Sequence, residues 1–144
     1  MSPPLYLNID RLDTLTFGGL KNGVQTLRRL LTKLGNPQDS FHVLHVAGTN
    51  GKGSVCQMLS QVLRKEFGYQ VGLTISPHLV DLTERIQING EYISHAQLDQ
   101  LLEKVFQIAE TEGVSLSFFE SMILAAILYF AQQKVDYAVI EVGL

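Results

Sequence analysis

Short apolar runs alternate with amphipathic segments along the chain. Three apolar runs have the length of a β-strand: residues 41–46, 69–75 and 135–142. Four segments carry apolar side chains at helical spacing: residues 24–34, 55–63, 94–112 and 118–133. Such alternation predicts an α/β fold with a mostly parallel sheet and helices on both faces. In folds of this kind, ligands bind beyond the carboxyl ends of the strands.

Turn and capping residues mark the ends of several elements. Residues 35–37, Gly-Asn-Pro, end the first helical segment, and Gly68 ends the second. Asn89-Gly90 predicts the tight turn of a small hairpin within residues 85–93. Ser94 is a candidate N-cap for the third helical segment.

Composition narrows the class of protein. With 144 residues, 46% of them hydrophobic and 17% charged, the chain fits one globular domain. Its net charge of −3 gives no electrostatic attraction for DNA or RNA, so we expect no nucleic-acid partner. The N-terminus lacks the basic and apolar regions of a secretory signal, and no apolar run approaches the roughly 18 residues that span a bilayer. We therefore expect a cytoplasmic protein with no membrane partner.

A glycine-rich segment follows the first apolar run. Residues 45–54 read His-Val-Ala-Gly-Thr-Asn-Gly-Lys-Gly-Ser. A glycine-rich turn between a strand and a helix can direct backbone N–H groups and a helix N-terminus at a polyphosphate, and a lysine adds a positive charge. We predict a nucleotide site with Lys52 as its catalytic cation. The residues predicted to form this site are Gly48, Thr49, Asn50, Gly51, Lys52, Gly53 and Ser54.

The spacing of this segment differs from the standard P-loop. That motif has four residues between its first glycine and Gly-Lys, and Ser or Thr follows the lysine directly. Here two residues intervene, Thr49 and Asn50, and Gly53 separates Lys52 from Ser54. The alternative is a glycine-rich connection that binds nothing. Three glycines, a lysine and a hydroxyl within residues 48–54 disfavour it.

A carboxylate near the end of the third apolar run is a candidate metal ligand. A nucleotide site requires oxygen ligands for Mg²⁺, which neutralises phosphate charge and keeps several waters. Glu141 can supply one such ligand, although by itself it is also compatible with an ordinary strand-end charge. A zinc site is disfavoured, because the four histidines form no close pair and Cys56 is the single cysteine.

Several motifs, in order and spacing, resemble the folylpolyglutamate synthase and dihydrofolate synthase family of the Mur ligase superfamily. They are the glycine-rich segment, Thr74-Ile-Ser-Pro-His-Leu79 with Thr83-Glu-Arg-Ile86, Leu116-Ser-Phe-Phe-Glu120, and Val139-Ile-Glu-Val-Gly143. Residues 17–23, Phe-Gly-Gly-Leu-Lys-Asn-Gly, are similar to the N-terminal segment of the family. The resemblance thus covers nearly the whole chain.

The resemblance implies an ATP-dependent carboxylate–amine ligase of folate biosynthesis. In that family, ATP phosphorylates a carboxyl group of dihydropteroate or folylpolyglutamate, and the amine of L-glutamate attacks the acyl phosphate. The resemblance further implies a P-loop NTPase-like, Mur ligase-type ATP-binding domain. In that domain residues 51–54 would hold the triphosphate, and Ser76 and Glu141 would ligate Mg²⁺.

The resemblance also implies contacts with the folate substrate. They fall on His78 and Arg85, in a mobile loop of the family, and on Ser117, Phe118, Phe119 and Glu120. Aromatic rings would stack on the pterin, and the carboxylate would accept its N–H donors. From spacing alone, Phe118 and Phe119 are better explained as core residues at a helix start, and Glu120 as an ordinary first-turn acid.

The resemblance ends with the last strand. Family members continue into a further glycine-rich loop and a C-terminal glutamate-ligase domain, so we expect residues 1–144 to be the N-terminal part of the ATP-binding domain, inactive alone. The alternative is a noncatalytic nucleotide-binding module or relic that pairs with another chain through its sheet edge. A small phosphotransferase is disfavoured, because we find no candidate base or lid arginine. Oligomeric state and preference between the two folate substrates stay open.

Overall fold

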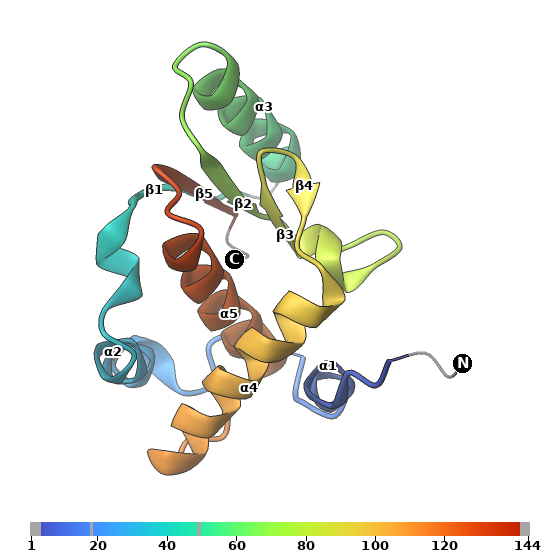
Figure 1. Cartoon of the computed structure of the whole chain (residues 1–144), viewed down its shortest axis with the longest axis vertical. Helices are drawn as coiled ribbons and strands as arrows, with labels where there is room; N and C mark the ends of the chain where they lie inside the picture. The colour runs from blue at the N-terminus through green and yellow to red at the C-terminus, as the bar shows by residue number, and fades with distance from the viewer. Residues whose placement is uncertain (1–3, 18, 49, 142–144) are drawn as a thin grey trace. The chain divides into compact units, whose positions relative to one another are not determined.

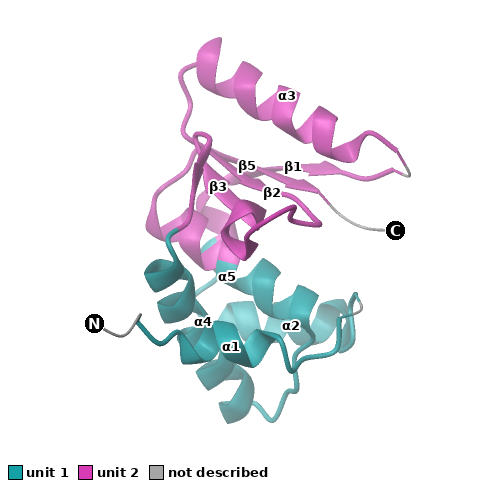
Figure 2. Ribbon diagram, turned by 90° about the vertical axis from the view of Figure 1, so that its right-hand side faces the viewer, with its two compact units in different colours: residues 1–37, 94–125 teal, residues 38–93, 126–144 magenta. Residues whose placement is uncertain are grey.

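The computed structural model describes residues 4–17, 19–48 and 50–141. The chain divides into two compact units, shown in different colours in Figure 2. Unit 1 comprises Met1–Pro37 and Ser94–Ala125, and unit 2 comprises Gln38–Ile93 and Ala126–Leu144. Thr49 of the predicted nucleotide site, Gly18, and residues 142–144 at the end of the last predicted strand lie outside the described residues.

Unit 2 contains a five-stranded sheet in the order β1-β5-β2-β3-β4 (Figure 1). The strands are β1 (His42–Val46), β2 (Val71–Thr74), β3 (Ile86–Ile88), β4 (Glu91–Tyr92) and β5 (Tyr137–Glu141). The three predicted strands pair in parallel, as β1 with β5 and β5 with β2. The predicted hairpin forms β3 and β4, and β3 joins the sheet antiparallel to β2. The mostly parallel sheet is confirmed.

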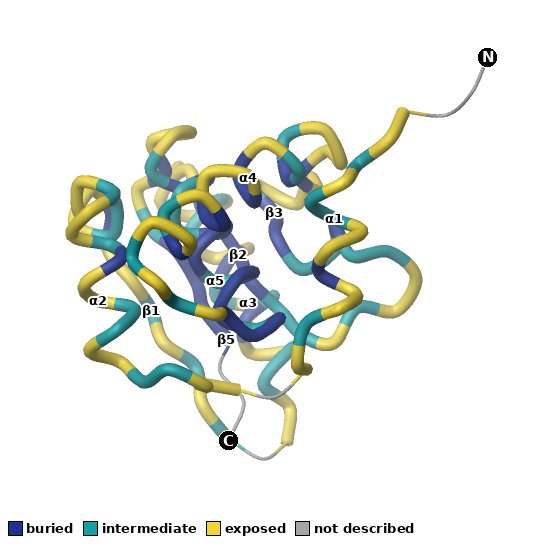
Figure 3. The backbone as a smooth tube through the Cα atoms, turned by 90° about the horizontal axis from the view of Figure 1, so that it is seen from below, coloured by how far each residue is buried: buried dark blue, intermediate teal, exposed yellow. Residues whose placement is uncertain are grey.

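Helices cover both faces of this sheet. On one face, α3 (Lys52–Lys65) places Cys56 in a buried cluster with Val71, Leu73 and Val139. On the other face, Phe130 of α5 (Phe118–Gln132) lies against Gly72, where a Cβ would come within 2.5 Å of the ring. Neighbouring residues of β2 face opposite sides, as the period of a strand requires. In Figure 3 the dark blue buried stretches include β2, β5 and α5.

Unit 1 is built from helices. They are α1 (Leu7–Leu12), α2 (Gly23–Lys33), α4 (His95–Thr111) and the first part of α5. Ser94 caps α4 as predicted, because its Oγ accepts a hydrogen bond from the backbone N–H of Gln97 at 3.1 Å. Two short 3₁₀ helices, both in unit 2 or at its border, complete the elements: η1 (Pro37–Ser40) and η2 (Leu82–Arg85). None of the described helices is long and apolar enough to cross a bilayer.

The helix α1 has no counterpart in the predictions. Its backbone is held by Asp99 of α4, whose Oδ1 accepts hydrogen bonds from the N–H groups of Asn8 at 2.9 Å and Ile9 at 3.0 Å. A six-residue helix is too short to show a hydrophobic period and too short to be stable in isolation. The carboxylate of Asp99, distant in sequence, thus accepts hydrogen bonds from N–H groups at the start of the helix, which have no acceptor within the helix itself.

Candidate functional site

The carboxyl ends of β1, β5 and β2 meet at one edge of the sheet. Val46 pairs with Glu141, and Thr74 pairs with Ile140. The glycine-rich loop leaves β1 at this edge and enters α3 at Lys52. The structure thus brings together the loop and the carboxylate that the sequence predicted for one site.

Gly51 provides the turn from the loop into α3. It is the N-cap residue with φ +71°, in the left-handed region that glycine adopts without steric cost. The first backbone N–H groups of α3 have no partner within the helix, and they carry the positive end of its dipole. The stem of Lys52 lies over the start of the loop, with its Cγ 3.8 Å from the Cβ position of Gly48. This arrangement can bind an anion.

Glu141 lies at the first turn of α3. Its Oε2 is 3.9 Å from the position that a Cβ on Gly53 would occupy. The side chain is buried, and Oε2 has no hydrogen-bond partner among the described residues. A buried carboxylate oxygen without a partner is costly and requires an explanation such as a bound ion. A hard oxygen ligand at the end of a strand beside a phosphate-type loop fits Mg²⁺, which takes one or two carboxylates and keeps several waters.

Thr74 is a second buried polar residue at this edge, and the sequence predictions did not include it. Its Oγ1 also lacks a hydrogen-bond partner within the described part of the chain. By the alternation of the strand, Thr74 faces the α5 side, whereas Glu141 faces the α3 side. The sequence signal that could have identified Thr74 is its hydroxyl at the end of an otherwise apolar strand. Within the residues described, no group of three or more His, Cys, Asp or Glu side chains forms a metal cluster.

Ser76 and His78 lie in the loop that follows β2. Ser76 is half-buried and is joined to Pro77 by a cis peptide bond. The Nδ1 of His78 accepts a hydrogen bond from the Nε of Arg85 at 2.7 Å. Burial lowers the pKa of the Arg85 guanidinium. The two substrate residues predicted in this loop therefore contact each other.

The carboxylate of Glu84 binds the backbone of the same loop. Its carboxylate accepts three backbone hydrogen bonds, from Leu79 at 3.0 Å, Val80 at 2.9 Å and Asp81 at 2.6 Å. These hydrogen bonds lower the pKa of Glu84. Leu79 and Val80 are 92% and 90% exposed. The loop thus displays two apolar side chains to solvent while its backbone is bonded internally.

The remaining predicted substrate residues lie in unit 1, at the start of α5. Ser117, Phe118 and Glu120 are buried, whereas Phe119 is half-buried. The Oγ of Ser117 donates to the carbonyl of Gly19 at 3.0 Å, and Phe118 stacks on Phe17 with ring centroids 4.6 Å apart. These are the contacts of packing residues, the alternative that spacing alone favoured. A role in substrate contact stays a prediction for all four.

Cys56 lies on the inner side of α3, close to Glu141. Burial, and then the negative charge of Glu141, raise the pKa of its thiol to about 11. Such a thiol is neutral at physiological pH and is a poor nucleophile. Cys56 therefore acts as a small apolar core residue.

Sequence comparison decides the family. No protein-family model matches the chain. A dihydrofolate synthetase from Saccharomyces cerevisiae is 40% identical over 122 residues, which are 85% of this chain and 28% of that protein. The chain belongs to the folylpolyglutamate and dihydrofolate synthase family and corresponds to its N-terminal portion. It spans about 28% of that relative's length.

Solved structures of the family have the same fold. Folylpolyglutamate synthase from Thermotoga maritima matches with a TM-score of 0.85 and 43% identity, over 96% of this chain and 33% of that one. The Mycobacterium tuberculosis folylpolyglutamate synthase, solved with ADP, matches with a TM-score of 0.83 and 33% identity, over 96% of this chain and 32% of that one. The resemblance and the α/β fold predicted from the sequence are thus confirmed.

Proposed function

We propose that this chain is the nucleotide-binding N-terminal part of an ATP-dependent ligase that joins L-glutamate to dihydropteroate or folylpolyglutamate. The observation that carries the proposal is the Oε2 of Glu141, which is buried at the first turn of α3 beside Gly53 and has no hydrogen-bond partner among the described residues. The family supports the substrates, because its members are named for this chemistry and one of them was solved with ADP.

The glycine-rich loop would bind the triphosphate. Residues 51–54 present the N–H groups of the first turn of α3, which have no partner within the helix, and Lys52 adds a positive charge. Gly53 has no side chain, which keeps the space between the helix and Glu141 open. Gly48, Thr49 and Asn50 would form the part of the loop that comes before residues 51–54.

Ser76 and Glu141 would hold Mg²⁺. The bound ion would neutralise phosphate charge. The Glu141 carboxylate is already desolvated at the start of the helix, so that a cation would satisfy Oε2 without rearrangement of the strand.

The chemistry requires activation of a carboxyl group, because a carboxylate is a poor acylating agent. A carboxylate oxygen of the folate substrate takes the γ-phosphoryl group of ATP, and ADP leaves. The neutral amine of glutamate then attacks the acyl carbon and loses a proton to solvent, the C–O bond to phosphate breaks, and inorganic phosphate departs with the carboxylate oxygen as the amide forms. Lys52 would stabilise the charge that develops on the transferring phosphoryl group.

The predicted substrate residues divide by their exposure. Phe119 is half-buried, so its ring can contact a flat heterocycle in the present conformation. Ser117 and Glu120 would instead act as positioning residues, because their side chains bind the segment that contains Gly19 and Asn22. His78 and Arg85 would contact the folate substrate from the loop whose backbone Glu84 binds.

The decisive experiment is Mg²⁺-dependent nucleotide binding by the Glu141→Gln variant. Isothermal titration with ATP, with and without Mg²⁺, should show that Mg²⁺ strengthens binding to the unaltered chain but has little effect on the variant. Glu66→Gln, at the other end of α3, is the matched control and should retain the Mg²⁺ effect. An unaltered Mg²⁺ effect in Glu141→Gln would reject the metal role. We expect the 144-residue chain to bind nucleotide without forming amide.

A second candidate function is a binding module that associates with another chain. β1 is the outer strand of the sheet. One flank of α3 faces the turn between β3 and β4. On that flank, the Nη1 of Arg64 lies 2.8 Å from the position that a Cβ on Gly90 would occupy. On the opposite flank, Val55, Met58 and Val62 are 45%, 65% and 47% exposed. An added strand beside β1, with its own covering element, would bury these side chains.

Sedimentation tests this second function. If it is correct, the chain associates with increasing concentration, and the double variant Met58→Lys, Val62→Lys stays monomeric with unchanged ATP affinity. A monomer over the whole concentration range would reject self-association.

A further inference from the structure

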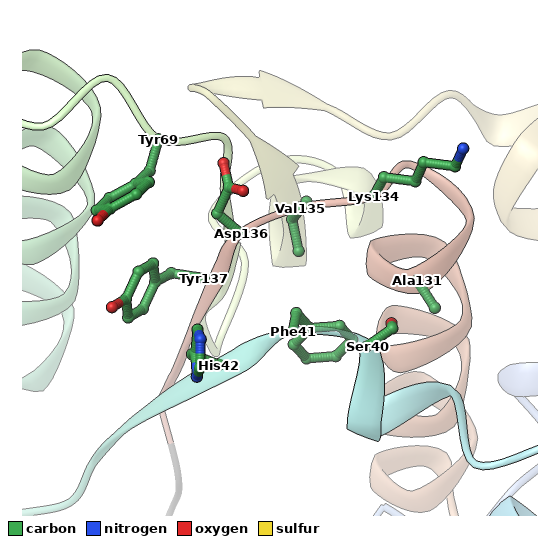
Figure 4. Close-up of a pocket in the computed structure, with 9 residues that line it drawn as sticks. All are labelled: Ser40, Phe41, His42, Tyr69, Ala131, Lys134, Val135, Asp136 and Tyr137. Atoms are coloured by element: carbon green, nitrogen blue, oxygen red, sulfur yellow. The ribbon is translucent and has the colours of Figure 1, made fainter.

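A pocket of about 340 Å³ lies in unit 2 where the parallel strands begin. Its lining includes the first residues of β1 and β5, His42 and Tyr137 (Figure 4). Strands of this length separate it from the glycine-rich loop by about 13 Å, at about 3.3 Å per residue. The pocket is therefore distinct from the candidate nucleotide site.

Three rings form one side of this pocket. The ring centroids of His42 and Tyr137 are 5.1 Å apart, and those of Tyr137 and Tyr69 are 5.0 Å apart. Figure 4 shows these rings in a row, with Phe41 and Val135 next to them. Aromatic faces beside an apolar surface favour a flat, apolar ligand ring.

The lining carries several groups that can donate a hydrogen bond to a ligand. They are the hydroxyls of Ser40, Tyr69 and Tyr137 and the ammonium group of Lys134. The acidic residue, Asp136, uses one carboxylate oxygen to accept the backbone N–H of Gln70 at 2.8 Å. A ligand with acceptor atoms can take hydrogen bonds from these groups.

Lys134 occupies a position that normally favours glycine. It follows the end of α5 with φ +56°. Its N–H bonds to the carbonyl of Ala131, and the N–H of Val135 bonds to the carbonyl of Phe130. This is the Schellman pattern, in which the left-handed residue is usually glycine. A lysine there places a positive charge at the pocket at a cost in backbone strain, and such strain points to a function.

We propose that this pocket binds a small planar aromatic carboxylate. The ring would stack beside Tyr137, and the carboxylate would pair with Lys134 and a tyrosine hydroxyl. The volume is near the lower end of ligand pockets, about 300 to 1,000 Å³, and suits a compound of one or two rings. In Figure 4 the Lys134 side chain extends away from the rings, so its flexible four-carbon stem turns toward the ligand on binding.

The probe is benzoate, followed by ¹H–¹⁵N NMR of the 144-residue chain. Saturable shifts are expected at the amides of His42, Tyr69, Lys134 and Tyr137, and none at residues 51–54. Cyclohexanecarboxylate keeps the charge without the aromatic ring, and benzyl alcohol keeps the ring without the charge. Each should bind about fivefold more weakly than benzoate. Equal binding of either analogue, or no saturable shift, would overturn the proposal.

Two variants separate a ligand role from a structural one. Lys134→Gly should raise the thermal unfolding midpoint, because glycine fits the left-handed conformation, yet it should weaken benzoate binding about fivefold and leave benzyl alcohol unaffected. Tyr137→Leu should weaken both probes, whereas Tyr92→Leu, at an exposed tyrosine of β4, should weaken neither. Unchanged benzoate affinity in Lys134→Gly would reject the carboxylate contact, even if Tyr137→Leu does not fold.

Discussion

The carboxylate of Glu120 accepts hydrogen bonds from both the backbone N–H and the side-chain amide of Asn22, at 2.7 and 2.8 Å, across 98 positions of sequence. It also accepts the N–H of Ser117 at 3.0 Å. Burial by itself would raise the pKa of Glu120, but the hydrogen bonds from Asn22, Ser117 and Lys21 outweigh it and lower the pKa. The carboxylate thus joins the segment before α2 to the start of α5.

Glu120→Gln should lower the free energy of unfolding by about 2 kcal/mol at pH 7, because an amide cannot accept from all of these donors. The folded pKa of Glu120 lies below its ordinary value of 4.5. Its stabilisation is therefore complete above pH 4.5 and is lost as the pH falls through the folded pKa. Urea unfolding at pH 7 and pH 3 should show that the difference between the two proteins shrinks in acid. Glu110→Gln, in an exposed ion pair with Arg11, should change stability by less than about 1 kcal/mol.

Lys52→Ala should lower ATP affinity at least about tenfold, because the charge over the glycine-rich loop is lost. The fold should be retained, since Lys52 is the first residue of α3 and is not part of its core. Isothermal titration measures the affinity, and circular dichroism checks the fold. Lys65→Ala, in the last turn of the same helix, is the control and should bind ATP normally. Equal ATP affinities for Lys52→Ala and the unaltered chain would reject the glycine-rich loop as the nucleotide site.

Gly72→Ala should destabilise unit 2 by about 2 kcal/mol through overpacking, because the new Cβ would lie 2.5 Å from the ring of Phe130. Thermal or urea unfolding measures the loss. Gly19→Ala is the matched substitution, since no atom of the described residues lies within 4 Å of its Cβ position. It should change stability little. Adding Phe130→Leu to Gly72→Ala should recover part of the loss if the ring is the cause.

Cys56 should make the protein less stable in alkali. Its folded pKa of about 11 exceeds the ordinary value of 9.0, so the stabilisation it contributes is complete below pH 9 and is lost as the pH rises toward 11. In Cys56→Ala the loss of stability between pH 9 and pH 11 that comes from this thiol should disappear. The native thiol should also resist iodoacetamide at pH 8 and react only after unfolding. Rapid modification of the folded chain would contradict the buried, neutral state.

Phe118→Ala and Phe119→Ala should have different effects. Phe118 is 3% exposed and stacks on Phe17, so its loss should cost about 3 kcal/mol of stability. Phe119 is half-buried, and its loss should lower pteroate affinity with a smaller effect on stability. Unfolding curves and titrations with pteroate and ATP distinguish the two. Equal losses of pteroate and ATP affinity in Phe119→Ala would indicate a folding defect instead of a substrate contact.

Local patterns in the sequence determined most of the elements of this protein. The apolar runs predicted the three parallel strands, the helical spacing predicted α2 to α5, and Ser94 and Asn89-Gly90 predicted a cap and a hairpin turn. These signals act over a few residues, where the period of the backbone and the chemistry of turns are decisive. The motif order likewise predicted the family.

Only the tertiary structure decided which of these residues meet. The sheet order places β5 between β1 and β2 and brings Glu141 to the start of α3. α1 depends on Asp99, and Glu120 faces Asn22 rather than solvent. No local pattern encodes such contacts, because hydrogen bonds and burial between distant segments arise from how the whole chain packs. The sequence by itself therefore determined most of the elements and the family, and packing decided α1 and the exposure and partners of the site residues.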